Sequence, residues 1–265
     1  MTSLDLLGKD YYSCESAIRY WSISQYKRFK ECEARALAEL RGDWTDTRDN
    51  TALLVGNYVH SYFESKAAHE EFKAQNGSEM ISTRGATKGQ LKKDYLVAEQ
   101  MIDALKSDSN FMAIYQGEKE AAITGFLGEI EFKGKIDCLN VERGYFVDIK
   151  TTKGQIDDTI WNGEERVRWF EAYGYILQMA AYKNMLEAKY NKPFEPIIYA
   201  VTKETPPDTR AIRIQNVDAM QMELDSLAQS IKRLDDVKKG IEKPKPCGKC
   251  EYCRQNKLSV RVEIF

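Results

Sequence analysis

The most constraining feature of the chain is an alternating run from position 121 to position 152, AAITGFLGEIEFKGKIDCLNVERGYFVDIKTT. Strand side chains point alternately to the two faces of a sheet, and short runs of this type bounded by turn residues are typical of strands. The run predicts three consecutive strands, with VERG at 141–144 as the hairpin turn between the second and third. The third strand ends in two charges, Asp148 and Lys150, which a purely structural strand would avoid.

Helical patterns stand on both sides of this run. We expect helices at 22–40, 51–72, 94–107, 167–190 and 217–239, strands at 196–203 and 209–215, and a surface loop at 75–93. This order predicts an α/β fold with a mixed central sheet flanked by helices and helical decoration at both ends. We expect a single domain over 1–265, with a core at about 20–240 and a basic, cysteine-containing tail at 241–265.

Length and composition limit the classes of protein to consider. A chain of 265 residues can bury a full hydrophobic core. Its apolar runs are far shorter than the roughly 20 residues that span a bilayer. The start, MTSLDLLGKDYYS, lacks a basic segment followed by an apolar one, so we expect a cytoplasmic protein. The net charge of -2 neither favours nor excludes a nucleic-acid partner, because phosphate binding needs only a local basic surface.

Two carboxylates are expected to face each other on the second and third strands. Pairing around VERG places Asp137 almost opposite Asp148, and like charges at that distance repel unless a cation lies between them. Carboxylate oxygens suit Mg²⁺, which retains waters that can attack phosphorus. Lys150 shares the strand face of Asp148, where it could orient or deprotonate the water and offset charge on a phosphate.

Two further pairs of residues accompany this strand motif. Gly56 and His60 are four apart on a predicted helix, and Gln178 and Tyr182 are four apart on the helix after the third strand. Taken singly, a helical histidine, a Gln and Tyr pair, or an Asp and a Lys at a strand end is most often structural. All four elements in this order are much less expected by chance. The chain has no Gly-rich phosphate loop that would indicate a nucleotide-cofactor enzyme.

The order GxxxH at 56–60, GKIDCL, DIKTT and QxxxY at 178–182 resembles the RecB-like branch of the PD-(D/E)xK nuclease superfamily, over most of residues 20–205. The resemblance implies a restriction-endonuclease-like core in which His60, Asp137, Asp148 and the Ile149 carbonyl bind Mg²⁺ or Mn²⁺. It also implies a catalytic Lys150, with Gln178 and Tyr182 positioning the site. Asp148 stands where the superfamily often has Glu. Relatives favour Glu120, before the first strand, as an additional acidic ligand, with Glu118 and Glu129 as other candidates.

A compact chain of this size is similar to the phage and prophage exonucleases of the RecE type (exodeoxyribonuclease VIII-like). That resemblance implies digestion of linear double-stranded DNA from a 5′ end by a ring-shaped homo-oligomer, a trimer or tetramer, in a bacterial host. The remaining 3′ strand would pass to a RecT-like single-strand annealing protein. A RecB-like nuclease of other polarity, an endonuclease, and a catalytically silent DNA-binding module of the same fold remain alternatives.

Four of the six cysteines form a candidate metal site. Cys247, Cys250 and Cys253 form CxxCxxC, and Cys32 supplies a fourth thiol from the first predicted helix. Such a set suits tetrahedral zinc or an iron-sulfur cluster, and some RecB-like and CRISPR-associated nucleases resemble it. Free thiols in a reduced cytosol are the alternative. Cys14 and Cys138 are expected to be structural.

Several residues could contact DNA outside the metal site. Ser24, Lys27 and Arg28 could hold a terminal phosphate at a helix start, and Thr151 and Thr152 could donate to the DNA backbone. The segment 232–265 carries ten Lys or Arg against five Asp or Glu, a local excess that could follow DNA. Trp161 and Trp169 could stack on bases, although burial is equally consistent with their positions.

Overall fold

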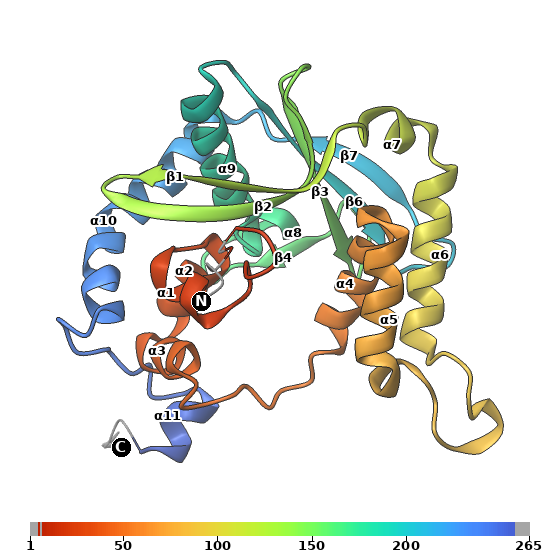
Figure 1. Ribbon diagram of the computed structural model, residues 1–265, viewed down its shortest axis with the longest axis horizontal. Coiled ribbons are helices and arrows are strands. Elements are labelled where there is room, and N and C mark those ends of the chain that lie inside the picture. Colours follow the sequence, from red (N-terminus) through yellow and green to blue (C-terminus); the bar gives the residue numbers. More distant parts are fainter. Residues whose placement is uncertain (1–4, 6, 258–265) are drawn as a thin grey trace.

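A five-stranded mixed sheet lies at the centre of the computed structural model, which describes residue 5 and residues 7–257 (Figure 1). Its order is β1 (Glu118–Leu127), β2 (Ile130–Asn140), β3 (Tyr145–Thr152), β6 (Glu195–Thr202) and β7 (Thr209–Arg213). All neighbours are antiparallel except β3 and β6, which are parallel. A parallel pair needs a crossover, and the long helix α9 (Tyr175–Tyr190) lies in that connection. The predicted α/β fold class is confirmed.

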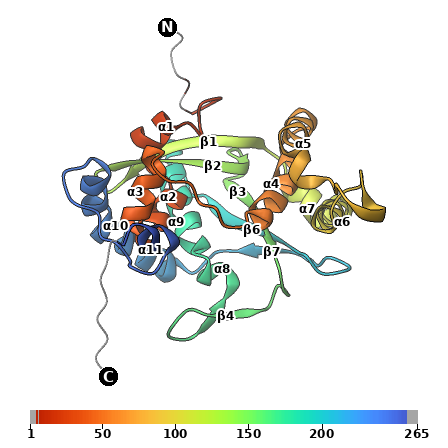
Figure 2. The ribbon, with the colours of Figure 1, turned by 90° about the horizontal axis from the view of Figure 1, so that it is seen from below.

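Helices cover both faces of the sheet, as Figure 2 shows from below. One face carries α2 (Ile23–Glu31), α3 (Glu33–Arg41), α9 and α10 (Val217–Lys238), and the other carries α4 (Thr51–Glu64), α6 (Lys93–Ser107) and α7 (Ser109–Ile114). Phe146 and Val147 on β3 are both fully buried, in the first and second of these cores respectively. The charged end of β3 therefore lies between two helical layers.

Two predicted helices are each broken by one extended residue. The helix expected at 22–40 ends at Glu31 and restarts at Glu33, because Cys32 between α2 and α3 is extended, with φ -165° and ψ 105°. The helix expected at 51–72 is α4 followed by α5 (Lys66–Met80). Ser65 between them is extended, and its hydroxyl accepts from the Ala68 N–H. Helical periodicity continues across both breaks, so it could not reveal them.

Other boundaries also differ from the prediction. The loop expected at 75–93 is shorter, because α5 extends to Met80 and α6 starts at Lys93, with a single 3-10 turn at Gly85–Thr87 between them. The helix expected at 167–190 is interrupted: α8 (Trp169–Ala172) ends before Gly174, whose φ of 66° starts α9. The helix expected at 217–239 is confirmed as α10.

One hairpin and three short helices were not predicted. A hairpin of β4 (Thr159–Trp161) and β5 (Arg166–Arg168) is inserted between β3 and α8 and projects from the body of the protein (Figure 2). Short helices occur at α1 (Cys14–Arg19), α7 and α11 (Glu251–Gln255), the last within the predicted basic, cysteine-containing tail. Within the described ranges, no helix is both long enough and apolar enough to cross a bilayer. Residues 258–265 of the predicted basic tail lie outside the described residues.

Candidate active site

The charged residues of β2 and β3 lie where the two strands separate. The ladder between them ends at Cys138 opposite Val147, and the same register carried one step further sets Asp137 opposite Asp148, as predicted from the turn. Beyond this point Asp137 Oδ2 accepts a 2.6 Å hydrogen bond from the Ile149 N–H. Both carboxylates are buried, with Asp137 7% and Asp148 2% exposed. The separation of the strands therefore creates an acidic interior at the ladder end.

Asp137 shares one group of candidate ligands with His60 and Glu120. A ligand atom from each of these three residues lies within 4.8 Å of the other two. His60, on α4, brings its Nδ1 to 3.1 Å from Asp137 Oδ2. Glu120 lies inside β1 rather than before it, because the strand starts at Glu118. Its φ is 51°, and the β1–β2 ladder omits Glu120 and Asp137 while keeping the same register on both sides, so the backbone of β1 is locally distorted at this residue without an inserted residue.

Asp148 makes a different set of contacts. Gln178 Nε2, on α9, donates to Asp148 Oδ1 at 2.8 Å, and the Lys150 ammonium forms an ion pair with Oδ2. Asp148 does not belong to the three-ligand group, so the expected trio of His60, Asp137 and Asp148 is arranged as two adjoining clusters. The two clusters are connected because Ile149, the residue after Asp148, donates its N–H to Asp137.

Burial and neighbouring charges shift the pKa values of the three carboxylates in different directions. Burial would raise the pKa of Asp137, but His60, Lys150 and the Ile149 N–H outweigh it and hold that pKa below its usual value. Burial and the Asp137 charge raise the pKa of Asp148 despite Lys150. Burial and Asp137 likewise raise the pKa of Glu120. For Asp148 and Glu120, burial is therefore the main cause of the raised pKa, and the Asp137 charge adds to it.

The pKa values of Lys150 and His60 both lie above their ordinary values. Burial lowers the pKa of Lys150, but Asp148 more than offsets this and the net pKa lies above its ordinary value. For His60, burial again lowers the pKa and Asp137 raises it to a greater extent. The raised pKa values of both groups follow from the same buried carboxylates.

These residues fit a divalent cation. Asp148 Oδ2 is buried and, within the described residues, accepts no well-oriented hydrogen bond, although Lys150 Nζ is close enough for an ion pair. Three carboxylates and one imidazole are hard oxygen and nitrogen donors of the kind that Mg²⁺ and Mn²⁺ accept. A cation among them would stabilise the buried carboxylates in the charged form, which burial and the Asp137 charge disfavour at Glu120 and Asp148.

Sequence reasoning missed Tyr175. Its ring lies under two ammonium groups, with Lys150 Nζ 4.7 Å and Lys27 Nζ 5.2 Å from the ring centroid. Lys27 also donates to the Tyr173 carbonyl at 2.8 Å, which brings α2 against the start of α9. The one available signal was that Tyr175 precedes Gln178 by three residues on a helix, which places both on one face.

Tyr182, predicted to position the site, is fixed by a close approach of α9 to the sheet. It is 8% exposed, and a Cβ added at Gly134 on β2 would lie 2.4 Å from its Cε1 atom. Gly134 therefore leaves the space that the ring occupies. Gly56, expected to allow a close approach, is less crowded: an added Cβ would meet only Thr151 Oγ1, at 3.8 Å.

A pocket of about 840 Å³ adjoins the acidic cluster. Gln178 and Tyr182 form part of one wall, and the expected phosphate-binding residues Ser24, Lys27 and Arg28 form part of another. Its charged lining residues are Lys27, Arg28, Glu39, Arg41, Lys133 and Lys135, which is five cations against one carboxylate. The pocket has the volume of a small-ligand site and a positive lining suited to a phosphorylated group.

The other proposed DNA contacts differ in accessibility. Thr151 is half-buried and Thr152 is buried, so Thr152 has little surface to offer a DNA strand. Trp169 is 2% exposed and donates to the Ile156 carbonyl at 3.0 Å, so stacking on bases is ruled out by its packing. Trp161, on the β4–β5 hairpin, is 61% exposed.

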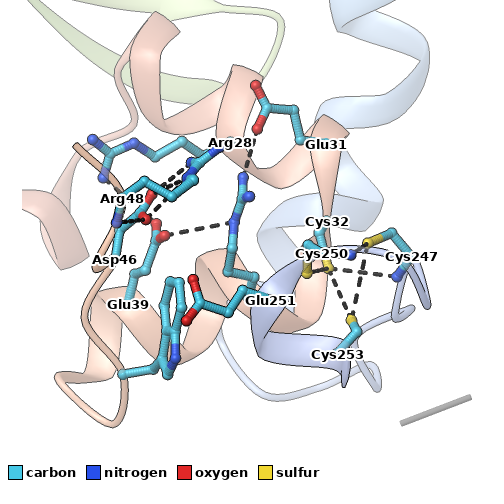
Figure 3. A network of polar contacts seen from close by, with 12 residues as sticks. Arg28, Glu31, Cys32, Glu39, Asp46, Arg48, Cys247, Cys250, Glu251 and Cys253 are labelled. Carbon is cyan, nitrogen blue, oxygen red and sulfur yellow. Dashed lines mark hydrogen bonds and ion pairs between the residues drawn. The ribbon is translucent and has the colours of Figure 1, made fainter. Parts of the chain in front are cut away.

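The four candidate metal-binding cysteines converge although their positions in the chain are far apart. Cys32, Cys247, Cys250 and Cys253 have all their Sγ atoms within 4.8 Å of one another (Figure 3). Cys32 is in the break between α2 and α3, rather than inside a helix as expected. Cys14 is exposed, and Cys138 is buried beside Lys119 Nζ at 3.1 Å; both lie outside the group.

Comparison with known proteins identifies the family. The family described as "PDDEXK-like domain of unknown function (DUF3799)" matches residues 22–256, a range that holds the acidic residues, Lys150 and all four clustered cysteines. The chain belongs to this family. Its PD-(D/E)xK character agrees with the fold and with the motifs from which the resemblance was drawn.

One solved structure is similar over nearly the whole chain. It is a "Putative exonuclease" from Eubacterium rectale, 31% identical, with a TM-score of 0.87, and the alignment covers 99% of this chain and 97% of that one. A second structure, named SSO0001, is 14% identical and covers 86% of this chain and 93% of that one. Its TM-score of 0.31 is too low to support any argument. No curated protein matches this DUF3799 chain.

Proposed function

We propose that this DUF3799 protein is a metal-dependent nuclease that hydrolyses phosphodiester bonds at the ends of double-stranded DNA. The observation that carries the proposal is the buried cluster at the diverging ends of β2 and β3, where Asp137, Asp148 and Lys150 meet His60 and Glu120. A buried group of like charges is unfavourable unless a ligand compensates it, so such clusters are typical of active sites.

His60, Glu120, Asp137 and Asp148 would hold the cation. Mg²⁺ or Mn²⁺ bound there would supply an activated water and offset negative charge on the phosphate. Lys150 would contribute a second positive charge beside the phosphate, and its ion pair with Asp148 and contact with Tyr175 fix its ammonium. Gln178 would hold Asp148 in one orientation through its 2.8 Å hydrogen bond.

The adjoining pocket favours exonuclease over endonuclease action. Its cations Lys27 and Arg28 lie on α2, and Lys27 and Lys150 share the Tyr175 ring, so a phosphate in the pocket would lie near the acidic cluster. A pocket of this kind accepts a chain end more readily than continuous duplex. The description of the Eubacterium rectale protein as an exonuclease points the same way.

We further propose the RecE-type activity that the motifs resemble. The protein would digest linear duplex from 5′ to 3′ as a ring-shaped trimer or tetramer and leave a 3′ strand for a RecT-like annealing protein of a phage or prophage. A ring would predict processive digestion, because topology retains the DNA after each cleavage. Light scattering that finds only monomer under assay conditions would remove the ring from this proposal.

The activity is tested on linear duplex DNA labelled separately at its 5′ and 3′ ends, with closed circular duplex beside it. We expect release from the 5′ label, dependence on Mg²⁺ or Mn²⁺, and no cleavage of the circle. Lys150→Ala should abolish digestion, whereas Lys153→Ala, an exposed lysine just past the same strand, should not. Release from the 3′ label would establish the opposite polarity, and cleavage of the circle would establish an endonuclease. Binding without cleavage would favour the silent DNA-binding module.

A further inference from the structure

The four clustered cysteines come from three separate parts of the fold. Cys32 lies at the break between α2 and α3, Cys247 follows α10, Cys250 is the N-cap of α11, and Cys253 lies inside that helix. Figure 3 shows their sulfur atoms facing one another. The Sγ of Cys32 is 3.5 Å from that of Cys253 and 3.8 Å from that of Cys250, and the sulfurs of Cys247 and Cys253 are 4.0 Å apart.

The distances distinguish between kinds of metal centre. Four thiolates around one zinc ion, at Zn–S of about 2.3 Å, form a tetrahedron whose edges are about 3.8 Å. The thiolates of a four-iron cluster lie outside a cube of iron and sulfide and are roughly 6 Å apart. Three of the six sulfur–sulfur separations are 3.5–4.0 Å and all six lie within 4.8 Å, which matches the first arrangement and leaves no room for the second.

Backbone groups also favour thiolates at this position. The Cys247 N–H points to Cys32 Sγ at 3.4 Å, and the Cys250 N–H points to Cys247 Sγ at 3.3 Å. Hydrogen bonds from N–H groups stabilise the negative charge of a ligating sulfur. Cys14 and Cys138 lie outside the group.

Apart from the cysteines, the segment that carries three of them is held mainly by polar contacts at the surface, such as Thr47 with Glu251 and the Lys245 N–H with Glu33. From 241 to 249 it contains no helix or strand, and Cys253 is the one buried residue between 241 and 257. The apolar core at this point consists of Cys32, Ala34 and Cys253 with a few half-buried neighbours. So small a core gives weak hydrophobic stabilisation, and a shared metal ion would replace it.

From these observations we infer that Cys32, Cys247, Cys250 and Cys253 bind a single structural Zn²⁺ that fastens residues 241–257 to the corner between α2 and α3. Binding releases four thiol protons to solvent and forms four Zn–S bonds, with no oxidant or reductant required. Zinc is preferred to a lone ferrous ion because divalent zinc binds such ligands more tightly. The inference goes beyond the proposed nuclease activity and does not depend on it.

Metal content of the unmodified protein is the first test. After gel filtration without added metal, we expect one zinc per chain, no iron, no acid-labile sulfide and four thiols that alkylating reagents reach only after zinc is removed. Iron with sulfide would overturn the inference in favour of a cluster, and iron alone would establish a mononuclear iron site. A protein with neither metal, or with a disulfide among these cysteines, would equally overturn it.

A second test asks whether the metal fastens the segment. Lys249 is exposed between two ligands and, unlike Lys243 and Lys245, is not followed by proline, so trypsin can cut after it. We expect cleavage between Lys249 and Cys250 to be at least tenfold faster once zinc is withdrawn.

Matched alanine variants separate the ligand role from simple burial. Cys253→Ala should lose the zinc and gain the cut, whereas Cys138→Ala, an equally buried thiol outside the group, should retain zinc and resist cleavage. Equal cleavage rates with and without zinc would contradict the fastening role, even if zinc were present.

Discussion

The close approach of α9 to β2 leads to a quantitative prediction at Gly134. In Gly134→Ala the new Cβ would lie 2.4 Å from Tyr182 Cε1 and 3.0 Å from two further ring atoms. The ring is buried, so it or the strand must shift, and overpacking of this kind costs about 1–3 kcal/mol. Alanine also restricts the unfolded chain, which returns about 0.5–1 kcal/mol. Taking the middle of each range, we therefore expect the free energy of unfolding to fall by about 1 kcal/mol.

Gly56 provides the matched control. It is also a glycine in a regular element, but an added Cβ would meet only Thr151 Oγ1, at an ordinary 3.8 Å. Gly56→Ala should therefore raise the free energy of unfolding by about 0.5–1 kcal/mol through helix propensity. Because Gly56 faces the end of β3, any loss of nuclease activity in this variant would reflect room needed by the substrate rather than instability.

Urea denaturation followed by circular dichroism measures both changes. For a protein of this size, each kcal/mol should shift the thermal midpoint by about 2–4 °C. Tyr182→Leu removes the ring atoms that clash, so Gly134→Ala should cost less in that background than in the unmodified protein. A Gly134→Ala variant as stable as the unmodified protein would refute the packing argument. An equal cost in both backgrounds would refute the role of Tyr182.

The remaining predictions concern the site and its surroundings. Gln178→Leu removes the hydrogen-bond donor to Asp148 and should lower the single-turnover cleavage rate about 10- to 100-fold, with little change in the free energy of unfolding. An unchanged rate would show that Asp148 does not need this hydrogen bond. Arg28→Ala should weaken binding to DNA ends and reduce the slope of log affinity against log salt by about one, and an unchanged slope would remove Arg28 from the interface. Trp161→Ala should change the free energy of unfolding by less than about 0.5 kcal/mol, since the ring is exposed, while slowing digestion of duplex more than of single-stranded DNA. Equal slowing on both substrates would exclude a role for Trp161 in separating the strands. Chelating resin that removes Mg²⁺ but leaves measured zinc intact should abolish cleavage, and added Mg²⁺ or Mn²⁺ should restore it; cleavage that persists would contradict the proposed metal dependence.

The sequence by itself determined the sheet and the acidic strand ends. Alternation over 121–152 and the VERG turn were sufficient, because strand period and turn length together fix register, and the register sets Asp137 opposite Asp148. The long helix α10 was equally predictable from its apolar stripe. These features are local, so neighbouring residues alone contain the information.

Tertiary structure decided how the site is assembled. No local pattern could show that Glu120, at a positive-φ position of β1, would join His60 and Asp137, or that Asp148 would turn toward Gln178 and Lys150. Tyr175 entered the site because α2 and α9 pack together and bring Lys27 to its ring. Each of these contacts joins elements distant in the chain, where the side-chain directions depend on packing.

The cysteines illustrate the same division. Their spacing suggested a metal site but left zinc, an iron-sulfur cluster and free thiols open. In the folded chain the helix ends before Cys32. The Cys32 sulfur then lies 3.5 Å from that of Cys253 and 3.8 Å from that of Cys250. The number of candidate ligands can be read from a sequence. The distances that select one metal centre over another depend on the fold, because it brings together segments more than two hundred residues apart.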